Sequence, residues 1–82
     1  MTDERKQEID RNFDYFQRNL GDYLRTNEGR FALLRNAKLV GFFKDPGEAY
    51  REGIAQFSDA LFSIQEVRKE PIELGHFAFD PY

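Results

Sequence analysis

The first third of the chain alternates apolar and charged positions with a helical period. Large apolar side chains recur at intervals of three and four residues, at Ile9, Phe13, Phe16, Leu20 and Tyr23. This spacing places them on one stripe of a helix, close to the seam of a coiled coil. We therefore predict a long amphipathic helix over residues 3–24, in which Gly21 marks a place to fray or bend.

Two short apolar runs follow within residues 30–44 and are separated by Asn36 and Ala37, which predicts a β-hairpin. A two-residue connection sets Arg35 opposite Lys38, and the like charges of this pair keep a longer loop open as an alternative. Simple alternation in the two-residue register predicts one face with Phe31, Leu33, Val40 and Phe42, and another with Ala32, Leu34, Leu39, Gly41 and Phe43. Both faces are apolar, so both need cover.

The sequence Asp45-Pro46-Gly47-Glu48 is typical of a helix start, with an N-cap, a proline at the first position and a glutamate at the third. It predicts a helix over residues 45–58 with an apolar set made of Ala49, Tyr50, Gly53, Ile54 and Phe57. Residues 60–67 predict a third strand, with Phe62 and Ile64 on one face and Leu61 and Val67 on the other. A right-handed crossover that places this strand beside the first gives the strand order 2-1-3.

These elements predict one α+β domain over residues 1–82. Its parts are an N-terminal helix in residues 1–27, a ββαβ core in residues 28–70, and a C-terminal strand or arm in residues 71–82. The sheet then has three strands, or four if the last segment joins it. The second helix covers one face of the sheet, and the N-terminal helix covers the other, either in its own chain or across a dimer.

Composition narrows the class of protein. The 82 residues contain no cysteine, so disulfides and thiolate metal sites are excluded. No apolar run approaches the ~18 residues that span a bilayer, and the charged N-terminus lacks the apolar region of a signal peptide. We therefore expect a cytoplasmic protein that does not enter membranes.

Charge is unevenly distributed along a chain whose net charge is −3. Basic residues gather around the predicted hairpin, at Arg30, Arg35, Lys38 and Lys44, whereas the second half is acidic. Phosphate attraction supplies most of the affinity of nucleic-acid binders, so the acidic balance makes a nucleic acid the less favoured partner. The basic hairpin keeps that alternative open.

Candidate catalytic chemistry is sparse. His76 is the one histidine, and its neighbours in sequence do not define a base with a nucleophile. Glu48 and Glu52 are four residues apart on the predicted second helix, where a solvated helix face explains them better than a metal site does. The sequence has no zinc spacing, phosphate loop or calcium loop. We predict no catalytic residue, no cofactor and no metal site, and hence a protein that is not an enzyme.

A resemblance adds to this picture. The motif residues are Gly29-Arg30-Phe31, Leu39-Val40-Gly41-Phe42-Phe43, Asp45, Glu48-Ala49, Gly53, Phe57, Phe62 and Val67. Over about half of the chain they resemble a family of small uncharacterised prokaryotic proteins, a domain of unknown function with a charged N-terminal helix, a hairpin, a capped helix and a strand. Some members are encoded beside small aspartyl proteases, which implies an accessory role. Ser58-Asp59-Ala60 departs from the pattern, because relatives tend to carry glycine there.

The function that the sequence favours is a small non-enzymatic interaction or accessory module that binds a protein partner or itself. The expected surface combines the helix stripe with the aromatic tail, and comprises Ile9, Phe13, Phe16, Leu20, Tyr23, Phe77, Phe79 and Tyr82. The alternatives are a regulatory nucleic-acid-binding protein that uses the basic hairpin, and an antitoxin-like inhibitor that neutralises a larger partner.

Overall fold

The structure, a computed structural model, describes residues 4–70 of the chain. Its elements in order are α1 (Glu4–Asn27), β1 (Phe31–Arg35), β2 (Lys38–Phe43), α2 (Pro46–Gln56) and β3 (Ser63–Glu66). The predicted α+β class is confirmed. The expected C-terminal strand or arm, with His76, Phe77, Phe79 and Tyr82, lies outside the described residues.

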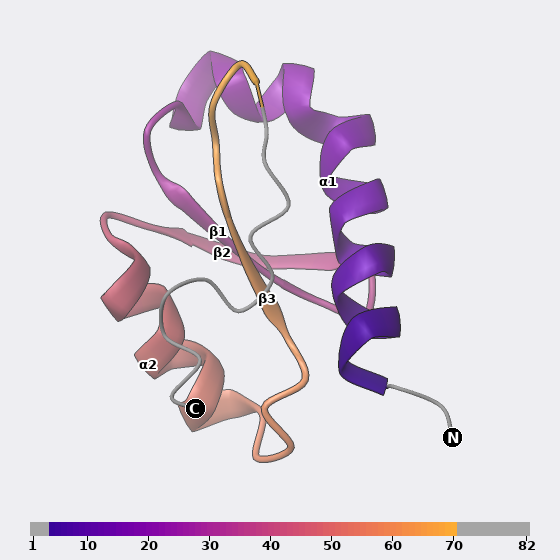
Figure 1. Cartoon of the computed structure of the whole chain (residues 1–82). Coiled ribbons are helices and arrows are strands. Elements are labelled where there is room, and N and C mark those ends of the chain that lie inside the picture. Colours follow the sequence, from indigo (N-terminus) through magenta and orange to yellow (C-terminus); the bar gives the residue numbers. More distant parts are fainter. Residues whose placement is uncertain (1–3, 71–82) are drawn as a thin grey trace.

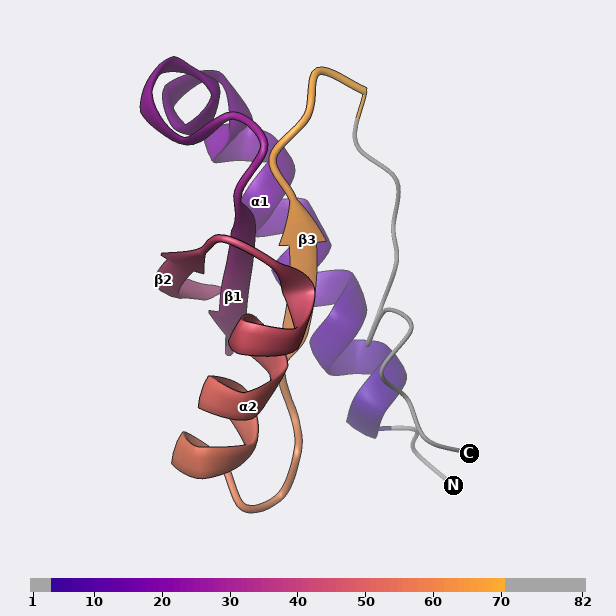
Figure 2. The same cartoon turned by 90° about the vertical axis from the view of Figure 1, so that its left-hand side faces the viewer.

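The elements form three layers, with the sheet between the two helices (Figures 1 and 2). The strand order is β2-β1-β3, and β1 pairs antiparallel with both neighbours, as the predicted order 2-1-3 requires. The third strand is shorter than the predicted 60–67, and Ala60 adopts a left-handed φ of 58° in the loop that leads into it. Residues 29 and 30 extend the β1–β3 pairing through backbone hydrogen bonds to Val67.

The hairpin has the predicted two-residue turn, but its register departs from simple alternation. Asn36 and Ala37 both have positive φ, at 56° and 60°, as the tight turns that match strand twist require. Beyond the turn, the pairing shifts between Leu33 and Leu34, so that Leu33 faces Gly41 instead of Val40. One extra residue in a strand reverses the faces of all that follow. The predicted faces of Phe42 and Phe43 are therefore wrong, and each side chain lies on the face that was predicted for the other.

The core between the sheet and α1, here called the α1-side core, consists of Phe16, Ala32, Leu34 and Val67. Leu20, Tyr23 and Phe42 pack against it, and the rings of Tyr23 and Phe42 meet edge to face at 5.1 Å. The helix runs three residues beyond the predicted end, to Asn27, and bends in the half that contains Gly21 (Figure 1). This core lies within one chain, so α1 covers its own sheet.

The core on the other face, here called the α2-side core, consists of Leu33, Ala49, Phe62 and Ile64. Phe62 lies against the backbone of α2, where a Cβ on Gly53 would come within 2.7 Å of its ring, so this position requires glycine. Asp45 caps α2 as predicted, since its carboxylate accepts a hydrogen bond from the Glu48 N–H. The helix ends at Gln56, before the predicted residue 58, and Ile54 is 43% exposed, which corrects its expected place among the core residues.

Candidate functional site

The outer edge of β2 is one of the two open edges of the sheet. β2 borders β1 alone, so the N–H and C=O groups along its other side have no strand partner among residues 4–70 (Figure 2). In an antiparallel pair, residues that exchange hydrogen bonds alternate with residues that do not. Arg35 and Lys38 close the two-residue turn and are a pair that exchanges hydrogen bonds. The next pair, Leu34 and Leu39, therefore does not exchange them, and the Leu39 N–H points to the open side.

Apolar side chains accompany this open backbone. Every residue of β2 after Lys38 is only partly buried, whereas the central residues of β1 are fully buried. Leu39 and Phe42 border the α1-side core, and Val40 and Phe43 border the α2-side core. Both cores therefore end in half-exposed apolar side chains at the same strand. We call this strand, with its open backbone and these four side chains, the β2 edge.

The residues of the predicted basic patch do not form one surface. Arg30 and Lys44 lie at one end of the hairpin, since Phe31 pairs with Phe43, and Arg35 and Lys38 lie at the turn. Five residues of strand separate the two ends, about 16 Å at about 3.3 Å per residue. Lys38 and Lys44 are both exposed and mark the two ends of the β2 edge.

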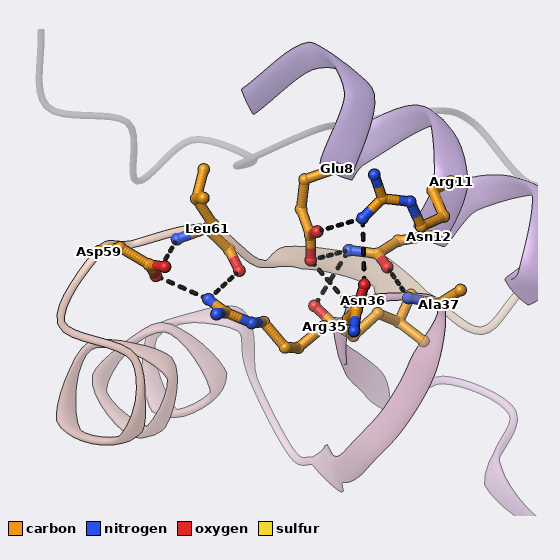
Figure 3. Close-up of polar contacts among 9 residues, drawn as sticks. Glu8, Arg11, Asn12, Arg35, Asn36, Ala37, Asp59 and Leu61 are labelled. Atoms are coloured by element: carbon orange, nitrogen blue, oxygen red, sulfur yellow. Dashed lines mark hydrogen bonds and ion pairs between the residues drawn. The ribbon is translucent and has the colours of Figure 1, made fainter. Parts of the chain in front are cut away.

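The guanidinium of Arg35 is bound by other groups of the same chain. Its Nη1 donates to Asp59 Oδ1 at 2.6 Å and to the Leu61 carbonyl at 2.8 Å (Figure 3), and its guanidinium lies 4.7 Å from the centre of the Phe57 ring. The hydrogen bond from Arg35 lowers the pKa of the Asp59 carboxyl, and the same bond raises the pKa of Arg35. Arg35 thus fixes the loop before β3 to the hairpin.

A buried polar cluster ties α1 to the hairpin turn. Glu8 Oε2 accepts from the Asn36 N–H at 2.7 Å, and Asn12 Oδ1 accepts from the Ala37 N–H at 2.6 Å. Asn12 Nδ2 also donates to Glu8 and to the Leu34 carbonyl, so the buried amide is satisfied on both sides (Figure 3). These contacts give both turn amides an acceptor within the protein. We call Glu8 and Asn12 the turn clamp.

A polar cavity of about 290 Å³ adjoins the turn clamp, and its lining residues are Glu4, Gln7, Glu8, Arg11, Arg35, Asn36 and Leu61. Three of its charged groups, Glu8, Arg11 and Arg35, are already paired. Arg11 Nη1 donates to Glu8 at 3.1 Å and to Asn36 at 3.2 Å, while Arg35 is bound to Asp59. The cavity therefore contains matched charges that hold α1, the turn and the loop before β3 together.

The predicted helix stripe divides along its length. Phe16 is fully buried and Leu20 and Tyr23 are partly buried against the α1-side core, so this half of the stripe is used inside the chain. Ile9 and Phe13 are partly exposed. In that first part of α1 the buried positions are those of the turn clamp.

The sequence reasoning missed both the turn clamp and the β2 edge. Glu8 and Asn12 precede Phe16 at four-residue intervals, so they are in phase with the buried face of the helix. The signal was present, because a tight turn with both residues at positive φ presents two amides that need acceptors. A helix stripe defined by apolar residues alone does not include the polar groups that would meet them.

Comparison with known proteins gives no relatives: no family model, no curated protein and no solved structure matches the chain. The resemblance to a family of uncharacterised prokaryotic proteins therefore stays a prediction. Within residues 4–70, no helix is long and apolar enough to cross a membrane. The same residues contain no group of three or more histidine, aspartate or glutamate side chains placed to share a metal ion.

Proposed function

We propose that this chain is a small non-enzymatic protein-interaction module that takes up an extended segment of a partner protein along the β2 edge. The observation that carries the proposal is the coincidence of two features on one strand. One side of the β2 backbone has no strand partner among residues 4–70, and the residues from Leu39 to Phe43 are all apolar or glycine and partly exposed. An added strand would form hydrogen bonds with the open backbone and would cover the apolar side chains.

The helix stripe is a less suitable surface for this role. Phe16 has no exposed area, and removing α1 from the sheet to expose the stripe would also break the turn clamp. The β2 edge needs no such rearrangement, because no strand of residues 4–70 covers its open side. Rigid docking without a change of backbone is the common case for preformed interfaces.

The nucleic-acid alternative draws less support from the arrangement of charge. Two of the four basic residues are at each end of the hairpin, and Arg35 is committed to Asp59 and Leu61. A salt-sensitive affinity for oligonucleotides, lost on Arg30→Glu with Lys44→Glu, would favour that alternative over strand addition.

The proposal is tested with a phage-displayed library of random nonapeptides selected on the full chain. Enriched peptides, remade in free form, are then titrated against the chain and against a synthetic chain with an Nα-methyl group on Leu39. Methylation removes one outward N–H and keeps the side chain, so we expect at least a tenfold loss of affinity. Ile54→Ser, which removes an exposed apolar side chain on α2, serves as the control and leaves affinity unchanged.

Amide chemical shifts identify the site directly. Bound peptide is expected to shift the amides of Lys38–Phe43 most strongly. The proposal is wrong if selection enriches no peptide, or if enriched peptides bind the methylated chain as tightly as the natural one.

A further inference from the structure

The charges at the two ends of the β2 edge restrict what can pair with it. Lys38 and Lys44 are exposed, and within residues 4–70 neither side chain forms an ion pair. Arg30 lies beside Lys44 across the hairpin and adds a further positive charge at that end. β2 itself carries no acidic residue. The strand therefore presents an apolar centre between two positive ends.

A second copy of the chain is a poor occupant of this edge. Antiparallel pairing of β2 with β2 of another copy sets Lys38 of one chain near Lys44 of the other, at both ends of the shared ladder. Parallel pairing sets like lysines side by side. Like charges on facing positions of neighbouring strands destabilise pairing, and lysines on an edge strand are a common protection against such association.

We infer that the β2 edge selects an extended segment of a different protein that has acidic residues at both ends of a short apolar stretch. The inference rests on the proposed function and specifies its ligand. Lys38 and Lys44 are six residues apart in sequence, but the extra residue in β2 leaves about five strand positions between them, about 16 Å at about 3.3 Å per residue, so the two acidic residues are also about five positions apart.

The side chains between the acidic residues face two apolar layers. Leu39 and Phe42 continue the α1-side core and Val40 and Phe43 continue the α2-side core, so successive partner residues meet apolar neighbours on alternate faces. Small β-branched residues suit both faces, because they favour strands and fill a half-buried surface. The ligand class is thus an acid-ended β-strand peptide.

Three labelled peptides test the inference: Glu-Val-Thr-Val-Thr-Glu and the same core with glutamine or with lysine at both ends. We expect the glutamate peptide to bind about threefold to tenfold more tightly than the glutamine peptide, and the lysine peptide to bind most weakly. The preference is expected to shrink as salt is raised from about 50 mM to about 500 mM, since the end charges are exposed. Fluorescence anisotropy with the full chain measures all three affinities.

Charge reversal gives the matched control. Lys38→Glu with Lys44→Glu is expected to invert the order of the glutamate and lysine peptides. Arg51→Glu with Lys69→Glu changes the net charge by the same amount at exposed positions outside β2, and is expected to preserve the order. If the control variant inverts the order as well, overall charge and not the β2 edge determines selection, and the inference is wrong.

The remaining outcomes separate the inference from the proposed function. Equal affinity for the three peptides, with shifts at the β2 amides, overturns charge selection and leaves strand addition in place. No binding of the glutamate peptide overturns the inference, and an unsuccessful library selection then overturns the proposed function too. A dimer of the free chain that Nα-methylation of Leu39 abolishes would show that the occupant is a second copy.

Discussion

The two outer strands of the sheet, β2 and β3, differ in how the polarity of their residues matches burial. β3 contains Ser63 and Gln65, yet these polar residues are only 4% and 3% exposed. β2 is apolar from Leu39 onward, yet none of its residues is fully buried. Burial here follows position among the layers and not the hydrophobicity of the strand. The proposal of strand addition rests on this contrast, because β2 stays apolar where it is partly exposed.

The largest expected effect compares the same substitution at the two edges of the sheet. Phe62 is fully buried in the α2-side core, and Phe43 borders the same core from β2. Phe62→Ala is expected to lower the free energy of unfolding by about 3–5 kcal/mol, and Phe43→Ala by about 1–2 kcal/mol, because the second ring is already partly solvated. Urea denaturation measures both.

Phe62→Leu, a smaller change at the same site, covers the case in which the alanine variant does not fold. Equal losses for the two alanine variants would show that β2 is as important to the core as the segment leading into β3, and would remove the distinction between the two edges.

The turn clamp provides the next effect, because it fixes the end of β2 to α1. Asn12→Ala leaves the Ala37 N–H without its acceptor and the Leu34 carbonyl without one donor, so we expect a loss of about 2–3 kcal/mol in unfolding free energy. Asn19→Ala is the matched control on the same helix, since Asn19 donates only to the Tyr15 carbonyl one turn away. Its expected loss is below about 1 kcal/mol. Similar losses would contradict the role of the clamp.

Backbone conformation gives a smaller effect of opposite sign. Ala37 in the hairpin turn and Ala60 before β3 have φ values of 60° and 58°, where a Cβ is disfavoured. Ala37→Gly and Ala60→Gly are each expected to raise the unfolding free energy by about 0.5–1 kcal/mol. Ala55→Gly, in α2, is the control and is expected to lower it by a similar amount. Thermal unfolding of the three variants tests the signs, and destabilisation by Ala37→Gly would contradict the assigned turn.

The smallest effect concerns the ion pair that joins the hairpin to the loop before β3. Arg35 lowers the pKa of Asp59 in the folded chain, so the pair stabilises the fold above the ordinary carboxyl pKa of about 3.9 and loses this effect as the pH falls through the lower folded value. The stability difference between the natural chain and Asp59→Asn is therefore expected to shrink as the pH falls from about 5 to about 2. A constant difference over this range would show that the charge of Asp59 does not matter.

Much of the fold followed from local signals in the sequence. The Asp45 cap and the two-residue turn each depend on residues close together in the chain, and both were predicted. The strand order 2-1-3 was also predicted, from the handedness of the crossover between β2 and β3. The bulge at Val40 was not, because it depends on how β2 fits β1 between two helices. Its consequence was the exchange of Phe42 and Phe43 between the faces.

The candidate site was less predictable than the fold. The basic residues were identified in sequence, but their division between the two ends of the hairpin and the commitment of Arg35 to Asp59 require the three-dimensional arrangement. The open side of β2 depends on the order of strands together with the register. The burial of Glu8 and Asn12 was not predicted either, because polar residues on a helix usually face solvent. The structure places them beside the turn amides that they bind.

The most direct test of the account is amide hydrogen exchange at Leu39, measured by NMR in the free chain and with saturating Glu-Val-Thr-Val-Thr-Glu peptide. The account predicts that the Leu39 N–H exchanges rapidly in the free chain and becomes protected when the peptide is bound, because an added strand accepts its hydrogen bond. A Leu39 N–H that is already protected in the free chain, or that exchanges equally fast with the peptide bound, would contradict the central claim that the β2 edge is a docking site for an extended segment.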